Sequence, residues 1–393
     1  MADPIATILP HNTSSSPARL LALDVFRGFT ILGMILVNNP GDWGHLYWPL
    51  GHADWHGWTP TDLVFPFFLF IVGTALAYSL RKYRTGTEIS SAVYWRILRR
   101  TAVLILLGLL LNRSSAVFSF LLGNADKVDL SNWRFPGVLQ RIGLVYFATS
   151  MIVLHLGVRA QAVLAVALLL GYWALLAWLP SGDYQANLST EGNVVRVVDR
   201  AVLGESHMWT QAKTEKTDPE GLLSTLPAIV TALLGYWAGL LIQRKGATVN
   251  TVGWLATAGV VCIGLGLLWG SAFPINKKIW TSSFVVLTAG WALVFLAGSL
   301  LKFDVWGWRR IGRAFEVVGV NAILVFVASG LSSVLLSVTH VGDQSTKQWL
   351  YETLFTSWIN TPELSSLAYA ITTVAFWWFA MWLLSLRGWT VRV

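Results

Sequence analysis

The stretch Trp43–Gly73, WGHLYWPLGHADWHGWTPTDLVFPFFLFIVG, decides how the rest of the chain is interpreted. It places three histidines, His45, His52 and His56, beside five tryptophan or tyrosine rings, just before a long apolar run. That run, Leu63–Leu80, is long enough to enter a bilayer. Because imidazole titrates near neutral pH, it suits proton transfer, nucleophilic attack or metal binding. The stretch predicts a site at a membrane face, although histidines that only cap a helix beside interfacial tryptophan would explain it as well.

The composition indicates an integral membrane protein. Of 393 residues, 55% are hydrophobic and only 12% are charged, which is about half the charged fraction of an ordinary globular protein. Ten apolar runs approach the roughly 20 residues that a spanning helix needs, and they lack the alternation of barrel strands. We therefore expect an all-α polytopic membrane protein with about ten transmembrane helices. The runs are Leu20–Val37, Leu63–Leu80, Thr101–Gly123, Gly137–Val158, Gln161–Leu179, Gly221–Ile242, Thr251–Phe273, Ile279–Leu301, Val317–Val338 and Leu364–Leu386.

The positive residues predict how the chain is oriented, because Lys and Arg prefer the cytoplasmic side of a membrane. Of the 28 Lys and Arg residues, 16 fall in one alternating set of loops and termini and nine fall in the other. The remaining three, Arg27, Arg113 and Arg141, lie within apolar runs. Both termini are therefore expected in the cytoplasm. The net charge of +8 then reflects cytoplasmic flanks, so no nucleic-acid partner is expected.

The domain organisation is expected to be simple. A single transmembrane domain over residues 19–393 follows a disordered cytoplasmic tail, residues 1–18, which is rich in Ser and Pro. Residues 181–220 form a long polar stretch that we interpret as a lid or a substrate-facing loop. Cys262 is the one cysteine and lies in an apolar run, which excludes a disulfide framework and a Cys-based metal site.

Several polar residues interrupt the apolar runs, and such residues are functional or partnered by default. Asp24 and Arg27 lie three residues apart on the first helix and can form an ion pair. Arg141, about one turn into the fourth run, requires a carboxylate or a phosphate. Asn321 is expected inside the ninth run. Asp218, with Glu220 close behind it, suits the start of the sixth helix.

A basic cluster precedes the third run. Arg96, Arg99 and Arg100 share one face of the entering helix. They can act simply as a topology determinant beside anionic lipid headgroups. Alternatively they form a phosphate-binding mouth, because arginine forks bind phosphate through two hydrogen bonds.

The chain also carries a set of motifs in a fixed order between about Leu21 and Trp382. They are LDVFRG (residues 23–28), VN (37–38), HADWHGWTPTDLVFPFFLFIVG (52–73), RFPGVLQRIG (134–143), VDRAVLGESHMW (198–209), TDPEGLL (217–223), FPINKKIW (273–280) and GVNAILVF (319–326). This ordered set resembles the heparan-alpha-glucosaminide N-acetyltransferase family. The resemblance implies a transmembrane N-acetyltransferase that moves acetyl from cytosolic acetyl-CoA to the amine of a glucosamine-type sugar across the membrane.

The resemblance also implies roles for particular residues. The essential histidine of the family falls on His52 and its accompanying asparagine on Asn38, whereas His56 stands where the lysosomal enzyme has asparagine. His52 is expected to act as general base or as acetyl carrier, and Asn38 to stabilise the thioester oxyanion. Supporting roles are expected for Asp24, Asp62, His56 and Asn321. The residues expected to hold acetyl-CoA are Arg27, Arg96, Arg99, Arg100 and Arg141, and those expected to face the sugar are Trp55, Trp58 and His207.

Two other classes of protein fit the same composition. A multi-span transporter of a sugar or organic anion would also contain buried Asp and Arg, but it typically shows an internal duplication with paired broken helices, which we do not see in the sequence. A membrane scaffold would leave the histidines and the basic cluster unexplained. The preferred interpretation is an acetyl-CoA-dependent acyltransferase without a metal, in a bacterial inner membrane. Its partners are the bilayer, acetyl-CoA and an amino sugar, and a homodimer is compatible with it.

Overall fold

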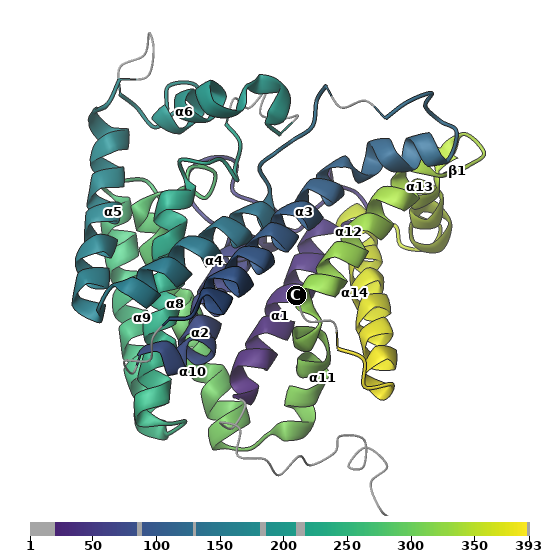
Figure 1. Cartoon of the computed structure of the whole chain (residues 1–393). Helices are drawn as coiled ribbons and strands as arrows, with labels where there is room; N and C mark the ends of the chain where they lie inside the picture. Colours follow the sequence, from purple (N-terminus) through teal and green to yellow (C-terminus); the bar gives the residue numbers. More distant parts are fainter. Residues whose placement is uncertain (1–19, 85–88, 129–130, 181–185, 210–216, 391–393) are drawn as a thin grey trace, which may run out of the picture.

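The computed structural model describes residues 20–84, 89–128, 131–180, 186–209 and 217–390. These residues form an all-α bundle (Figure 1), as the sequence predicts. Strand pairing within the described ranges is confined to a small hairpin of β1 (His340–Val341) and β2 (Gln344–Ser345). The predicted tail, residues 1–18, lies outside the described residues.

The bundle is built from long helices joined by short ones. The long helices are α1 (Leu21–Asn38), α2 (Pro60–Ser79), α3 (Ser91–Leu121), α4 (Val138–His155), α5 (Val158–Trp178), α8 (Thr225–Lys245), α9 (Val249–Gly270), α10 (Ser282–Ser299), α11 (Arg309–Val320), α12 (Ala322–Val338) and α14 (Pro362–Leu386). The short elements are α6 (Val194–Leu203), α13 (Thr346–Tyr351), 3₁₀ turns at Trp48–Leu50, Arg81–Arg84 and Glu205–His207, and π-helical turns at Leu300–Val305 and Glu352–Thr356.

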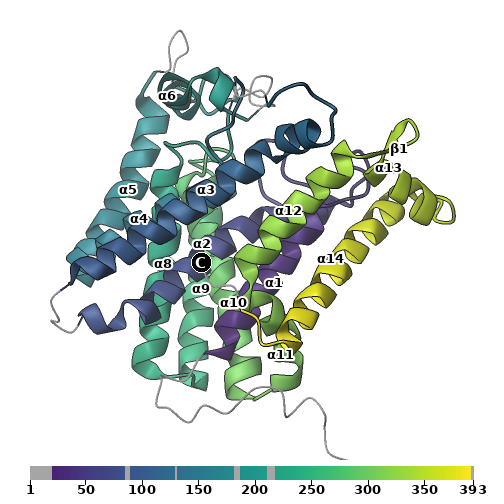
Figure 2. The same cartoon turned by 45° about the vertical axis from the view of Figure 1, so that its right-hand side comes forward.

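The expected number of spans is confirmed. Within the described ranges, nine helices are long and apolar enough to cross a membrane, and the pair α11 and α12, bent by 66°, makes ten if it forms one span. α1 begins and α14 ends at the same end of the bundle (Figure 1). We call this the inner end, and we call the opposite end, which carries α6 and β1, the outer end (Figures 1 and 2).

Three predicted boundaries differ from the structure. α3 begins at Ser91, ten residues before the apolar run, because its first turns are polar but still helical. α8 begins at Thr225 and not at Asp218, since the acids bind an arginine instead of capping the helix. The ninth run is not one straight helix, because α11 ends at Val320 and Asn321 lies at the bend.

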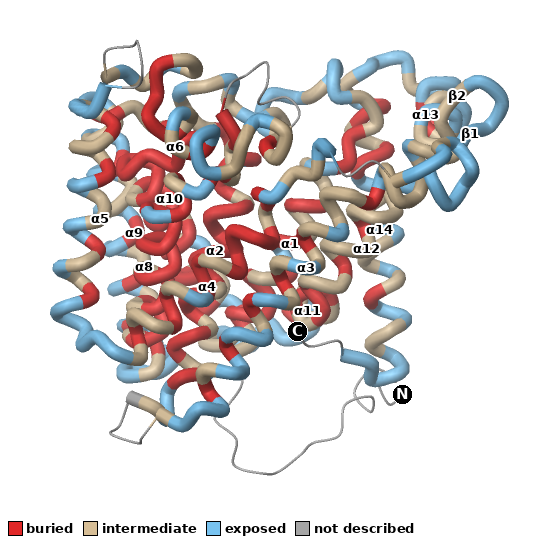
Figure 3. The backbone as a smooth tube through the Cα atoms, turned by 45° about the horizontal axis from the view of Figure 1, so that its top comes forward, coloured by how far each residue is buried: buried red, intermediate tan, exposed pale blue. Residues whose placement is uncertain are grey.

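α2 and α8 form the centre of the bundle because small residues let their backbones approach closely. A Cβ atom added at Gly73 would collide with the carbonyl oxygen of Ala232, and one added at Gly235 would collide with the carbonyl oxygen of Phe70. Close backbone contact through small residues is a general device for packing helices in a membrane. Figure 3 shows the resulting buried centre, whereas outer helices such as α5 and α14 expose apolar side chains, as lipid-facing helices do.

We predict that Gly235→Ala lowers the thermal unfolding midpoint in detergent, because overpacking costs about 1 to 3 kcal/mol. Gly171→Ala on α5 is the matched control, since the structure places no atom within 4 Å of its added Cβ. Alanine favours a helix by up to about 1 kcal/mol over glycine, so the control should melt at or above the wild-type temperature. Equal midpoints for the two variants would contradict this account of the α2–α8 contact.

Candidate active site

The site begins with the N-terminus of α2, which forms at the outer end of the bundle for local reasons. Pro60 occupies the first helical position, where its missing N–H is not needed. Asp62 is the third residue of the helix, and its Oδ2 accepts hydrogen bonds from the N–H of Thr59 at 3.0 Å and of Ala53 at 3.1 Å. The Thr59 hydroxyl donates to the carbonyl of Gly51 at 2.7 Å. One buried carboxylate therefore fixes both the start of α2 and the loop before it.

The second oxygen of Asp62 holds His52. The distance from His52 Nδ1 to Asp62 Oδ1 is 2.7 Å, and the carboxylate is 1% exposed whereas the imidazole is 44% exposed. A contact this short between a nitrogen and a carboxylate oxygen requires a hydrogen between them, so Nδ1 carries the proton and Asp62 accepts it. In the neutral imidazole, His52 Nε2 is then the nitrogen that carries the lone pair. This is the arrangement of a histidine base oriented by a carboxylate.

Lys277 completes the cluster from a distant part of the chain. Its Nζ lies 3.3 Å from Asp62 Oδ1, 3.0 Å from His52 Nδ1 and 3.4 Å from His52 Nε2. The lysine belongs to the turn between α9 and α10, and its side chain is 16% exposed. Burial lowers the Lys277 pKa below its ordinary value, although Asp62 and Glu220 act to raise it. Lys277 was not predicted as a site residue, because its motif FPINKKIW gives no local sign that the lysine meets His52.

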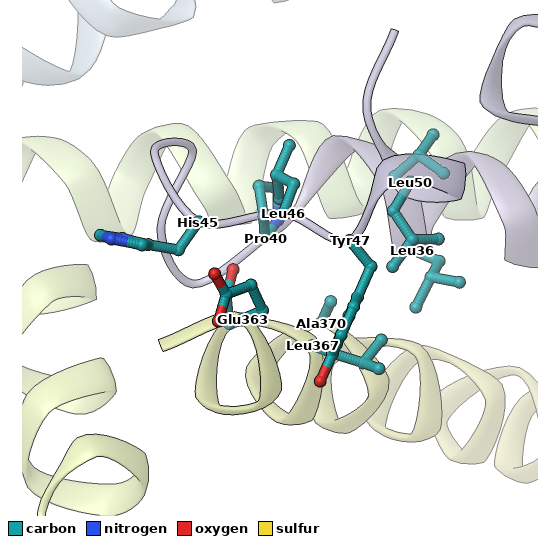
Figure 4. Close-up of a pocket in the computed structure, with 11 residues that line it drawn as sticks. Leu36, Pro40, His45, Leu46, Tyr47, Leu50, Glu363, Leu367 and Ala370 are labelled. Carbon is teal, nitrogen blue, oxygen red and sulfur yellow. The ribbon is translucent and has the colours of Figure 1, made fainter. Parts of the chain in front are cut away.

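The other two histidines of the loop have different surroundings. His56 Nδ1 lies 3.4 Å from Asn276 Nδ2, and burial lowers the pKa of His56. His45 Nδ1 lies 2.7 Å from Asp42 Oδ2, and this hydrogen bond lowers the pKa of Asp42. His45 borders a small crevice between α1, the outer loop and α14 (Figure 4). Since His52 is not among the residues that line it, this crevice is separate from the cluster.

The tryptophans and the asparagine expected near His52 are only partly assembled around it. Trp55 Nε1 donates to the carbonyl of Leu188 at 2.7 Å and so joins the histidine loop to the outer cap. The Trp58 ring packs on Trp291, with centroids 5.9 Å apart. Asn38 is exposed at the end of α1, and the structure records no hydrogen bond between it and His52 among the described residues.

The arginines expected to bind acetyl-CoA lie in separate regions. Arg96 and Arg99 are exposed near the inner end of α3. The Arg100 guanidinium lies 4.8 Å from the centre of the Tyr146 ring. Arg27 pairs with Asp24 at 3.1 Å near the inner end of α1, which confirms the predicted ion pair. Asp24 lies 14 residues before Asn38, roughly 21 Å along the helix, so it cannot contact His52 directly.

Arg141 is buried near the outer end of α4 and binds neutral groups. It donates to the carbonyl of Gly221 at 2.8 Å and to the Ser224 hydroxyl at 2.5 Å, and it lies 5.1 Å from the centre of the Trp280 ring. Its Nε and one terminal nitrogen are buried without a hydrogen-bond partner among the described residues. Other buried side-chain atoms of α3 and α4 share this feature, and they are Arg100 Nε, Thr101 Oγ1, both Gln140 amide atoms and Thr149 Oγ1.

The outer end of the bundle is covered by a cap that includes α6, and two aspartates, Asp218 and Asp199, hold this cap in place. Arg134 binds Asp218 and Glu220, each at 2.6 Å; burial acts to lower the Arg134 pKa, but the two acids keep it above its ordinary value. Asp199 on α6 accepts hydrogen bonds from the N–H groups of Leu222 and Leu223 through one oxygen. Its other oxygen has no hydrogen-bond partner within the part of the chain that the structure describes, and burial raises the pKa of Asp199 to about 6.

His207 belongs to this cap and not to the cluster around His52. Its Nδ1 donates to the carbonyl of Trp133 at 2.9 Å, and its ring stacks on Phe135 with centroids 4.1 Å apart. Asn321, at the bend between α11 and α12, donates to the carbonyl of Trp389 at 3.4 Å. No group of three or more His, Cys, Asp or Glu side chains is placed to hold a metal ion within the described parts of the chain.

The fold and the site define a class of protein: a multi-pass helical membrane protein with a histidine, a carboxylate and a lysine gathered at one end of its bundle. Comparison with known proteins gives the family. A sequence model described as heparan-alpha-glucosaminide N-acetyltransferase, catalytic, matches residues 19–264, and the chain belongs to this family.

Two curated relatives carry the same name. The human heparan-alpha-glucosaminide N-acetyltransferase is 29% identical over 363 residues, which cover 80% of this chain and 53% of the human protein. The mouse protein is 29% identical over 376 residues, which cover 83% of this chain and 56% of the mouse protein. The chain thus spans about half the length of these relatives. The matched region of the family model includes His52 and Asp62 but ends before Lys277.

Replacing each of the two cap aspartates by asparagine should change the stability of the protein in a different way. Between pH 3.8 and about 6, folded Asp199 holds a proton that the unfolded chain releases, so stability falls as pH rises through this window, by up to about 3 kcal/mol. Asp199→Asn should remove this part of the pH dependence. Asp218→Asn should instead lower the unfolding midpoint at pH 7, because it breaks a buried pair with Arg134.

Thermal unfolding of the wild type and both variants, measured from about pH 4.5 to about pH 7, checks this prediction. The difference between wild type and Asp199→Asn isolates the contribution of that group. An identical pH slope in both proteins would show that Asp199 does not titrate in the window.

Proposed function

We propose that this protein is a transmembrane N-acetyltransferase that moves acetyl from cytosolic acetyl-CoA to the amine of a glucosamine-type sugar at the outer end of the bundle. The observation that carries the proposal is the 2.7 Å contact between His52 Nδ1 and Asp62, which makes Nε2 the basic nitrogen of the ring. Family membership supports the reaction class. Because the chain spans about half of the named relatives, heparan is not assumed to be its acceptor.

His52 is proposed as the general base. A protonated amine is not nucleophilic, so the ammonium of the sugar must lose a proton before it attacks the thioester carbonyl carbon. That first proton goes to solvent. As the C–N bond forms, Nε2 takes the second proton from the attacking nitrogen; the C–S bond then breaks, the coenzyme A thiolate leaves, and the imidazolium returns its proton to that thiolate. Asp62 stabilises the imidazolium that forms transiently, as a carboxylate does in a hydrolytic triad.

Asn38 is proposed as the donor to the thioester oxygen. Its exposed position at the outer end of α1 leaves the amide available to a substrate. A well-placed amide donor is worth about 3 kcal/mol at an oxyanion site. Trp55 is proposed to face the sugar, since its indole lies between the histidine loop and the outer cap.

The donor is proposed to bind from the inner end. Arg96, Arg99 and Arg100 are suited to its phosphates. Arg100 is also one of the residues of α3 and α4 whose buried polar atoms lack a hydrogen-bond partner among the described residues, and we call this set of atoms the seam. Buried polar groups without partners are costly and require explanation, and the amide-rich arm of coenzyme A offers donors and acceptors to such groups. We therefore propose that the arm follows this seam toward Arg141. When bound, acetyl-CoA supplies the activated acetyl group.

The location is proposed as a bacterial inner membrane, with the inner end in the cytoplasm, on the distribution of Lys and Arg described above. A transporter remains the competing class. The bent pair of α11 and α12 resembles a broken transporter helix, but a histidine oriented by a buried carboxylate serves proton transfer and favours the acyltransferase.

We predict that His52→Ala lowers acetyl transfer to glucosamine by roughly 100-fold or more, since acid–base catalysis contributes about that much. His45→Ala and His56→Ala are the controls and should retain most activity, because neither histidine contacts Asp62 among the described hydrogen bonds. Binding of acetyl-CoA should survive in all three variants. The measurement is transfer of radiolabelled acetyl to glucosamine by the purified protein.

The same assay without acceptor separates the two chemical routes. Direct transfer predicts no trappable label on the protein, whereas an acetyl-histidine intermediate predicts label on His52. If His52→Ala acetylated glucosamine at close to the wild-type rate, the catalytic assignment would be wrong and a transport function would be the better explanation.

A further inference from the structure

We propose that Lys277 is a positioning residue that keeps His52 in its neutral, proton-accepting form by balancing the charge of Asp62. For its effect on catalysis, this inference rests on the proposed function. As a statement about the protonation of His52, it stands on the geometry of the three side chains and can be tested without substrate.

The position of Lys277 beside the imidazole is the first observation. Its Nζ lies at similar distances from the two ring nitrogens, 3.0 Å from Nδ1 and 3.4 Å from Nε2. Since Nδ1 donates its proton to Asp62, Lys277 cannot also donate to that nitrogen. The ammonium instead has two acceptors, Asp62 Oδ1 at 3.3 Å and the lone pair of His52 Nε2 at 3.4 Å. Lysine and histidine therefore share one carboxylate oxygen.

The charges in this cluster favour a neutral imidazole. Asp62 is nearly completely buried, and one cation balances its charge. Lys277 supplies that cation, so protonation of His52 would place a second positive charge beside the first. A positive charge at this range disfavours the charged form of a neighbouring basic group. The effect is the reverse of that of an opposite charge, which shifts a pKa toward the charged form by about 1 to 3 units. Glu220 and Lys278 also act electrostatically on Lys277, and His56 contacts the neighbouring Asn276.

The turn that carries Lys277 is held by hydrogen bonds and by a buried tryptophan, which keep the lysine beside His52. The Asn276 side chain accepts a hydrogen bond from the N–H of Ile279 at 3.1 Å, and the N–H of Thr281 donates to the carbonyl of Asn276 at 3.0 Å. Trp280 is completely buried and adopts φ +48°, a left-handed conformation that is unusual for a bulky residue. Such a conformation persists only where the surrounding structure determines it.

Removal of the lysine charge should therefore reverse the preference of His52. In Lys277→Met, Asp62 has no cation to balance it, and protonation of the imidazole at Nε2 restores neutrality. His52 should then be protonated at higher pH than in the wild type, and the base should be lost near neutral pH. Lys277→Arg retains the charge and should retain the wild-type behaviour.

The experiment measures the reactivity of His52 with diethylpyrocarbonate, which reacts with an imidazole only while that imidazole is neutral. Purified full-length protein without substrate is treated from about pH 5 to about pH 9, and the rate at each histidine is read by peptide mass spectrometry. The midpoint for His52 should rise by about one pH unit or more in Lys277→Met. It should stay at the wild-type value in Lys277→Arg and in Lys278→Met, which removes the adjacent charge. His45 is an internal reference for folding and reagent.

Four further outcomes test the inference and separate it from the proposed function. The double variant Asp62→Asn, Lys277→Met should bring the midpoint back toward the wild-type value, because both opposing charges are gone. An unchanged midpoint in Lys277→Met would overturn the inference. The absence of acetyl transfer in the wild type would instead refute the proposed function, while the titration result would still stand. If transfer does occur, the acidic limb of its kcat/KM profile should move with the His52 midpoint.

Discussion

The carboxylate of Asp62 is the group on which the candidate active site depends. Its Oδ2 accepts the N–H groups that shape the start of α2 and the loop before it, and its Oδ1 receives His52 and Lys277. A buried carboxylate is stable only when hydrogen bonds and cations replace water. The same requirement that stabilises Asp62 therefore also orients the imidazole and fixes the lysine beside it.

The rest of the bundle supports this arrangement. α2 is held against α8 through glycines that permit close backbone contact, so the N-terminus of α2 has a fixed position at the outer end. Trp55 ties the histidine loop to the cap, and Trp280 anchors the turn that carries Lys277 next to buried Arg141. The site is thus built from a rigid centre outward, which is what precise positioning of a base requires.

The sequence predicted the spans well because each needs only a run of about 20 apolar residues. It also predicted the ion pair of Asp24 and Arg27 from helical spacing, and it singled out His52, which the structure places beside Asp62, from a local motif. It failed where structure depends on distant partners. Lys277 meets His52 across 225 residues of chain, and hydropathy does not report such a contact. Likewise, Asp218 binds Arg134 and does not begin α8, because the ion pair outweighs the local preference for a helix start.

The central claim is that the acetyl group passes from donor to acceptor beside His52. Its most direct test is a cryo-electron microscopy structure of the protein bound to a bisubstrate analogue in which coenzyme A is joined through a two-carbon linker to the amine of glucosamine. The account predicts that this amine lies within about 3 Å of His52 Nε2, with the phosphates at the inner end near Arg96, Arg99 and Arg100. An analogue bound elsewhere, for example in the crevice beside His45, with His52 still facing solvent, would contradict it.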